Sequence, residues 1–256
     1  MLGKSDDDKT VFYFKIILAG IKIEVECRNR RDFAFCKNYL SAFDSADFIV
    51  KASSDEIEKA EKELADRLNI ADFSAKEIRG IENQIIYRKI VEQSIKFNTV
   101  LVHGAVVAKD GNGYMFTAPS GVGKTTRTRI FQGIYPDAIV VNGDKPLIKI
   151  TSAQAIACGT PWCGKEGWNT NIMVPLRAIF LLERVEKGEI SSIEEVSLGK
   201  AFPFLLQQTY HADDPDLMRK TLQLLKSLEG KVKIYRFRST PSAESVRLAY
   251  ETAKPQ

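Results

Sequence analysis

Alternation of apolar and polar residues in the first part of the chain predicts a small α+β module. Residues 11–18 and 21–27 are two apolar runs separated by Ala19 and Gly20, and the second run alternates with polar residues. They predict a β-hairpin with one solvent-facing side. Apolar residues recur at helical spacing through 74–96. The other elements predicted here are a short helix over 31–43, a strand over 47–51 and a charged helix over 54–68.

From Thr99 the pattern changes to strands joined by glycine-containing turns. Residues 99–108 and 113–117 are apolar and flank the short loop 109–113, which predicts a hairpin. Because parallel neighbours need a long crossover, a hairpin here predicts a sheet of mixed strand directions. The later predicted elements are helices over 126–133, 197–210, 216–228 and 242–253, and strands over 138–144, 147–150, 153–157, 174–183 and 232–238.

The predicted architecture is α/β, with a small α+β module over 1–98 followed by a mixed-sheet domain over 99–256. Ser242 is expected to cap the last helix. In the helix over 216–228, a leucine stripe is expected to face the core. Its members are Leu217, Leu222, Leu225 and Leu228.

Composition narrows the class of protein. Of the 256 residues, 44% are hydrophobic, enough for a sizeable core. The net charge is +4, from 37 basic and 33 acidic side chains, and no basic run is interleaved with aromatics, which argues against a nucleic-acid partner. No apolar stretch approaches the roughly 20 residues that cross a bilayer, and the acidic segment 1–9 is unlike a signal peptide. We therefore expect a cytoplasmic protein with no membrane partner.

The cysteines do not fall in a metal-binding spacing, and the chain has only two histidines, so a zinc site is not expected. Reduced thiols are the expectation for a cytoplasmic protein. A disulfide between the last two cysteines, which bracket a glycine-rich loop, stays open as the alternative. The residues concerned are Cys27, Cys36, Cys158, Cys163, His103 and His211.

The segment Ala118-Pro-Ser-Gly-Val-Gly-Lys-Thr125 matches the Walker phosphate-binding pattern between a strand and a helix, with Ala118 in place of the first glycine. Gly121 and Gly123 let the backbone turn its N–H groups toward a polyphosphate at the positive end of the helix. Lys124 would reach the β- and γ-phosphates, and the Thr125 hydroxyl would ligate Mg²⁺. A glycine-rich turn with an unrelated lysine is the alternative. The predicted nucleotide-binding residues are Ser120, Gly121, Val122, Gly123, Lys124, Thr125 and Thr126.

Asp144 ends the apolar strand predicted over 138–144. An acid at the carboxyl end of a buried strand beside the phosphates is placed to bind Mg²⁺ or to accept a proton. Asn-Gly-Asp is also a turn signal, so a turn aspartate is the alternative.

The loop over 159–168 contains three glycines and two tryptophans, which suggests a mobile flap over the nucleotide or acceptor. Lys165 is its functional candidate. Structural packing is the alternative for the rings of Trp162 and Trp168.

Charged residues near two strand ends are minor candidates. Glu183 could bind a metal or form a salt bridge. Arg236 and Arg238 share one face of their predicted strand, where a solvated surface is favoured over a phosphate clamp.

Val102-His-Gly-Ala-Val-Val-Ala108, residues 114–125 and residues 139–144 together resemble the catalytic core of HPr kinase/phosphorylase and its relatives, including serine-kinase-like proteins of peptide-modification clusters. That superfamily is similar to the nucleotide domain of ATP-dependent phosphoenolpyruvate carboxykinase. The resemblance spans about residues 99–183. Residues 1–98 do not look like the N-terminal domain of HPr kinase.

The resemblance implies a mixed-sheet P-loop kinase that binds Mg-ATP and phosphorylates a serine-like hydroxyl of a small molecule, peptide or protein. It implies that His103 lies near the transferred phosphoryl group, although a core histidine with satisfied hydrogen bonds is the alternative. Asp144 matches the second acid of a catalytic pair whose first member is Gly143 here. The family's HPr-binding signature is not recognisable. The resemblance extends to proteins that form oligomers, so a homo-oligomer is left open.

Two function classes follow. The first is an ATP- and Mg²⁺-dependent kinase in which Asp144, Lys124 and His103 are catalytic, and Thr125 and Asp144 hold the metal. The second is a nucleotide-binding regulator or slow ATPase that has lost phosphotransfer with the first acid. Carboxykinase-like chemistry is a third option, but the histidine and lysine metal ligands of that enzyme are not evident.

Overall fold

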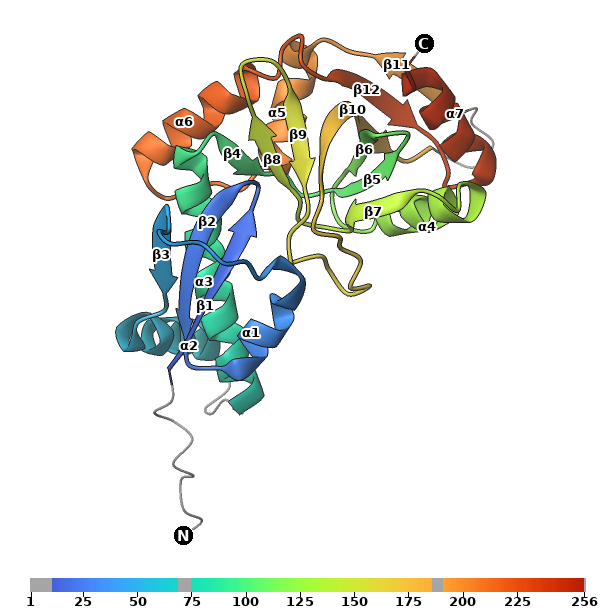
Figure 1. Ribbon diagram of the computed structural model, residues 1–256. Helices are drawn as coiled ribbons and strands as arrows, with labels where there is room; N and C mark the ends of the chain where they lie inside the picture. The colour runs from blue at the N-terminus through green and yellow to red at the C-terminus, as the bar shows by residue number, and fades with distance from the viewer. Residues whose placement is uncertain (1–10, 69–74, 186–190, 256) are drawn as a thin grey trace. The chain divides into compact units, whose positions relative to one another are not determined.

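The computed structural model describes residues 11–68, 75–185 and 191–255. The chain forms two compact units, residues 1–93 and 94–256 (Figure 1). The division falls inside helix α3 (Ala75–Lys96), whereas the domain boundary predicted from sequence lies just beyond that helix.

The first unit contains a three-stranded sheet in the order β1-β2-β3. Strands β1 (Phe12–Leu18) and β2 (Ile21–Cys27) form the predicted hairpin, and β3 (Phe48–Lys51) pairs in parallel with β2. Alternate residues of β2 are buried, which confirms the predicted two-sided pattern. Helix α2 (Ser54–Leu68) has the predicted bounds.

The single helix predicted over 31–43 is wrong. Helix α1 (Arg30–Phe35) stops early and is followed by the short 3-10 helix η2 (Lys37–Tyr39). Beyond it, Leu40 forms an antiparallel bridge with Ile16 on β1, and the Ser41 amide donates to the Lys15 carbonyl. Tertiary pairing with the edge of the sheet therefore overrides local helix propensity.

The second unit is built on a mixed sheet, as predicted. The strand order is β4-β8-β9-β10-β6-β5-β7, with β12 on β10 and β11 on β12. β10 is antiparallel to β9 and parallel to both β6 and β12. The strands are β4 (Thr99–Leu101), β5 (Ala105–Lys109), β6 (Asn112–Thr117), β7 (Ile139–Asn142), β8 (Leu147–Ile150), β9 (Ala155–Cys158), β10 (Met173–Glu183), β11 (Ser192–Glu195) and β12 (Lys233–Arg238).

The strand predicted over 99–108 is two strands. β4 pairs with β8, whereas β5 pairs with β6 and β7, so the chain changes partners between them. The break contains His103, whose amide donates to the Gln208 carbonyl. β7 ends at Asn142, two residues before the predicted end, and β11 was not predicted.

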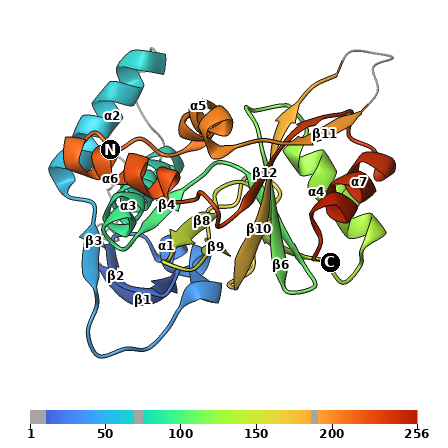
Figure 2. The same cartoon turned by 90° about the horizontal axis from the view of Figure 1, so that it is seen from above.

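Helices cover the two faces of this sheet (Figure 2). On β6, Met115 belongs to one hydrophobic cluster and Tyr114 and Phe116 to another, because successive side chains point to opposite faces. The first cluster includes residues of α5 (Leu198–Gln208) and α6 (Pro215–Lys226), and the second residues of α4 (Lys124–Ile134) and α7 (Ala243–Ala253).

Two finer helix predictions have different outcomes. Ser242 caps α7 in a reciprocal hydrogen-bonded box with Ser245, as predicted for the cap. On α6 the predicted stripe is partly wrong, because Leu224 packs in the core and Leu222 is only partly buried and outside the cluster. Leu217, Leu225 and Leu228 contact the core as predicted. Within the described residues, no helix combines the length and apolarity needed to cross a membrane.

Candidate functional site

The segment 118–123, called here the phosphate loop, joins β6 to α4. Gly121 and Gly123 have φ of 81° and 105°, in the left-handed region that favours glycine. At Gly123 an added Cβ would lie 2.9 Å from Cγ of Pro241 and 3.0 Å from Nη1 of Arg127. Gly123 is the N-cap of α4, so the helix begins at Lys124, earlier than predicted, and its positive end faces the loop.

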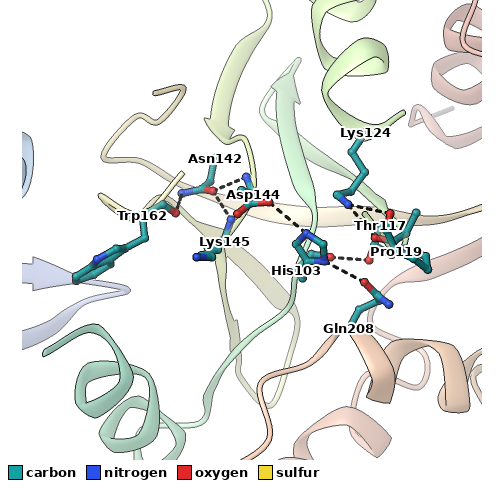
Figure 3. Close-up of polar contacts among 10 residues, drawn as sticks. His103, Thr117, Pro119, Lys124, Asn142, Asp144, Lys145, Trp162 and Gln208 are labelled. Atoms are coloured by element: carbon teal, nitrogen blue, oxygen red, sulfur yellow. Dashed lines mark hydrogen bonds and ion pairs between the residues drawn. The ribbon is translucent and has the colours of Figure 1, made fainter. Parts of the chain in front are cut away.

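Three cations hold carbonyl oxygens of the phosphate loop. Lys124 Nζ donates to the carbonyls of Ala118 at 2.8 Å and Pro119 at 3.3 Å (Figure 3). Arg127 Nη1 donates to the Val122 carbonyl at 3.2 Å, and Arg184 Nη2 to the Gly121 carbonyl at 2.5 Å. Within the described part of the chain, the N–H groups of residues 120–123 make no hydrogen bond. Successive amides without acceptors, in a turn with left-handed glycines before a helix, are the kind of donors that an anion-binding nest uses.

Arg127, in the first turn of α4, is fully buried. Its Nη2 donates to the carbonyl and hydroxyl oxygens of Ser239, at 2.6 and 2.8 Å, and its guanidinium lies over the Phe237 ring. Burial lowers its pKa to about 10. Arg127 thus ties the phosphate loop to the segment that follows β12. Arg127 was not predicted as a site residue, because nothing in the local pattern marks its distant partner.

His103 lies between two polar partners near the loop (Figure 3). Its Nε2 is 3.2 Å from Asp144 Oδ1, and its Nδ1 is 3.0 Å from Gln208 Oε1. The His103 carbonyl accepts from the Thr117 hydroxyl at the end of β6. Asp144 and Gln208 thus hold the imidazole, and Thr117 holds the backbone of the same residue. Gln208, at the end of α5, was not predicted as a site residue.

Asp144 follows β7 and is partly exposed. The hydrogen bond from His103 holds the pKa of the Asp144 carboxyl below its usual value. Desolvation acts in the opposite direction, and the charges of Lys145 and Lys124 lower the pKa further. Burial lowers the pKa of Lys124, and Asp144 opposes that shift. The charges of Lys124 and Asp144 are thus close enough to act on each other. The structure therefore brings the predicted residues Lys124, Asp144 and His103 together.

Asn142, buried at the end of β7, fixes the turn that carries Asp144. Its Oδ1 accepts from the amides of Asp144 at 2.9 Å and Lys145 at 2.6 Å. Its Nδ2 donates to the carbonyls of Thr160 at 3.0 Å and Trp162 at 3.2 Å. The Asn-Gly-Asp turn signal was visible in the sequence, but the tie to the loop over 159–168 was not.

The loop over 159–168 packs against this turn. A Cβ on Gly143 would lie 3.1 Å from the Cys163 carbonyl oxygen and 3.5 Å from that of Trp168. A Cβ on Gly164 would lie 3.1 Å from Asp144 Cβ. Trp162 is buried, as its packing alternative expected, and Lys165 is exposed. The flap function remains a prediction.

The remaining nucleotide candidates surround the start of α4. Ser120 and Thr126 are exposed, Val122 is partly buried, and Thr125 is a partly buried residue of the first helical turn. The Thr125 hydroxyl and the Asp144 carboxylate are hard oxygen donors of the kind that suits Mg²⁺. In the described residues, no three His, Cys, Asp or Glu side chains gather to hold a metal by themselves. That is compatible with Mg²⁺, which uses few protein ligands together with substrate phosphates.

Glu183 forms ion pairs with Arg236 Nε at 3.1 Å and Arg238 Nε at 3.8 Å, which is the salt-bridge alternative. All three side chains are substantially exposed, so the pairs contribute little stability. The four cysteines are free thiols, so the Cys158–Cys163 disulfide left open above is absent.

The chain was compared with known protein families, curated proteins and solved structures. No curated protein matches the chain. Among solved structures, the Hpr(Ser) kinase/phosphatase from Coxiella burnetii is similar at 11% identity over 49% of this chain and 88% of that chain, with a TM-score of 0.28. The family model described as SynChlorMet cassette protein ScmC matches residues 68–212, more than half of the chain. The protein therefore belongs to the ScmC family of SynChlorMet cassette proteins.

Proposed function

We propose that this protein is an ATP- and Mg²⁺-dependent kinase that phosphorylates a serine-like hydroxyl of a small molecule, peptide or protein. The observation that carries the proposal is the phosphate loop with hydrogen-bond-free amides at 120–123, beside Lys124, which contacts the loop carbonyls, and Asp144, which is held by His103. Amides and Lys124 supply donors for the phosphates, and Asp144 supplies an acceptor for the proton of a hydroxyl.

The residues of the chain have separate tasks in this reaction. The loop amides and Lys124 bind the phosphates of ATP. The acceptor oxygen forms a bond to the γ-phosphorus as the bond from that phosphorus to the bridging oxygen breaks, and ADP leaves. Asp144 takes the hydroxyl proton, and His103 orients its carboxylate. A carboxyl with a lowered pKa is a weak base, but phosphoryl transfer needs the proton removed only late.

Thr125 and Asp144 would hold Mg²⁺ together with the phosphates. When bound, Mg²⁺ neutralises charge on the β- and γ-phosphates.

A second candidate is a nucleotide-binding regulator or slow ATPase. The observation that favours it is Gly143, which stands where the resemblance expects the first acid and is closely packed by backbone of residues 163 and 168. A site with one acid that is already hydrogen-bonded to His103 could bind nucleotide without transferring its phosphoryl group.

Asp144→Asn should separate these functions. The variant keeps the side-chain shape and one oxygen that can still face Mg²⁺, but it cannot accept the proton. We therefore expect nucleotide binding to remain, with at most a modest loss of affinity, and phosphorylated product to fall by about 10²-fold or more. The measurement is mass spectrometry after incubation with Mg-ATP and free serine, a peptide panel or cell extract, beside calorimetric binding of a non-hydrolysable ATP analogue. Asp216→Asn on the exposed start of α6 is the matched control.

Hydrolysis without any phosphorylated product, equal in wild type and Asp144→Asn, would support the regulator instead. Lys124→Ala should abolish nucleotide binding under either function, so it tests the site itself. Retention of wild-type binding in Lys124→Ala would remove the basis of both candidates.

A further inference from the structure

Arg184 is a cation of the phosphate loop that the proposed function does not use. It follows β10, which runs parallel to β6 with Leu181 opposite Thr117. Both strands therefore end at the same edge of the sheet, and the chain beyond Glu183 continues alongside the phosphate loop. Arg184 thus reaches the loop from the neighbouring strand and not from the helix that carries Lys124.

The Arg184 guanidinium contacts the phosphate loop through only one of its N–H groups. One N–H donates to the Gly121 carbonyl at 2.5 Å, and a guanidinium has five N–H groups. The side chain is exposed, and in the described residues it has no carboxylate partner. The adjacent Glu183 is paired with Arg236 and Arg238, so its charge is compensated elsewhere. Arg184 retains both charge and donors for an anion.

The position of Lys124 indicates where the terminal phosphate of a bound nucleotide would lie. A lysine of this motif reaches the β- and γ-phosphates. Here its Nζ lies at the carbonyls of Ala118 and Pro119, which directly follow β6. The terminal phosphate is thus expected at the β6 end of the loop, and β10, the strand that delivers Arg184, is the parallel neighbour of β6.

We infer that Arg184 contacts the terminal phosphate of the donor and makes the site selective for a nucleoside triphosphate over a diphosphate. The inference rests on the proposed function, because it needs a nucleotide in the phosphate loop. A guanidinium binds phosphate oxygens through two N–H groups and stays charged, and an arginine supplied from the same chain can stabilise charge in phosphoryl transfer. Arg184 is a catalytic residue in this proposal.

The test compares two probes, Mg-AMP-PNP and Mg-ADP, by isothermal titration calorimetry on the full-length wild type, Arg184→Ala and Arg184→Lys. We expect Arg184→Ala to weaken AMP-PNP binding at least about tenfold and ADP binding by less than about threefold. Arg184→Lys should recover part of the loss, because it retains charge but not the planar fork. Arg219→Ala, on the exposed face of α6, is the control and should change neither affinity.

Each outcome has a defined meaning. An equal loss for both nucleotides would show that Arg184 only braces the loop through Gly121, and unchanged affinities would show no contact; either result overturns the inference while the proposed function stands. If wild type binds neither nucleotide, the proposed function fails and the inference fails with it.

Discussion

The space around Gly143 limits which acids the site can contain. A Cβ there would lie 3.1 Å from the Cys163 carbonyl oxygen, so that neighbour would have to move by a few tenths of an ångström. A carboxylate would also stand among backbone carbonyl oxygens, which repel it. The loop over 159–168 therefore leaves little room for an acidic side chain at position 143, whereas it accommodates Asp144.

Gly143→Asp, which introduces the acid that the resemblance expects, should destabilise the protein and not raise its activity. We expect a loss of about 1–3 kcal/mol in the free energy of unfolding, from overpacking and charge against carbonyl oxygens. Urea denaturation with a phosphotransfer assay measures both. Gly133→Ala in α4 is the control, because a Cβ there meets nothing within 4 Å. A stable and more active Gly143→Asp would contradict this account.

Among the elements, α1 and α3 are joined within the first unit by a hydrogen bond between a buried aspartate and a partly buried asparagine. Asp32 Oδ1 accepts from Asn83 Nδ2 at 2.9 Å, whereas Oδ2 is buried with no hydrogen bond. Burial raises the pKa of Asp32 to about 6, and burial also raises the pKa of the neighbouring Glu82. The folded unit therefore binds a proton at Asp32 more tightly than the unfolded chain does.

Stability of this unit should rise as pH falls from about 6 toward about 4, the unfolded pKa, and be lost as pH rises through 6. Asp32→Asn should remove most of this dependence and stabilise the unit at pH 7 by about 3 kcal/mol. Hydrogen exchange of β1 and β2 amides at pH 5 and 7, corrected for intrinsic rates, measures the stability of this unit at each pH. Exposed Asp44→Asn should leave the dependence intact; the same behaviour in Asp32→Asn would refute the assignment.

In the whole molecule, the residues proposed to bind nucleotide all belong to the second unit. A ligand stabilises the part of the chain that binds it. We expect calorimetric unfolding to show two transitions, with Mg-ATP at about 100 times its Kd stabilising only one of them, by about 2.7 kcal/mol. Lys124→Ala should abolish the shift. An equal shift of both transitions would contradict independent unfolding of the units.

The sequence predicted the parts of this molecule that depend on short-range pattern. The alternation in β2, the Ser242 cap and the glycines and lysine of the phosphate loop are local features, and each lies where it was expected. ATP, Mg²⁺, a cytoplasmic location and the hydroxyl acceptor remain predictions.

The parts that sequence analysis missed depend on distant partners. Arg127 and Ser239 are 112 residues apart, His103 and Gln208 are 105 apart, and Arg184 and Gly121 are 63 apart. No local period signals such pairs, because they form only when the mixed sheet brings strand ends together. The same cause ended the helix predicted over 31–43, where pairing with β1 prevailed.

The bond between Arg127 and Ser239 also bears on the order in which the molecule can mature during synthesis. Ser239 follows β12 and lies 112 residues after Arg127, so a polypeptide still growing on the ribosome lacks this anchor until those residues have emerged. The glycines and lysine of the phosphate loop are therefore synthesised well before the residue that anchors Arg127, and the loop of a partly made chain lacks that support.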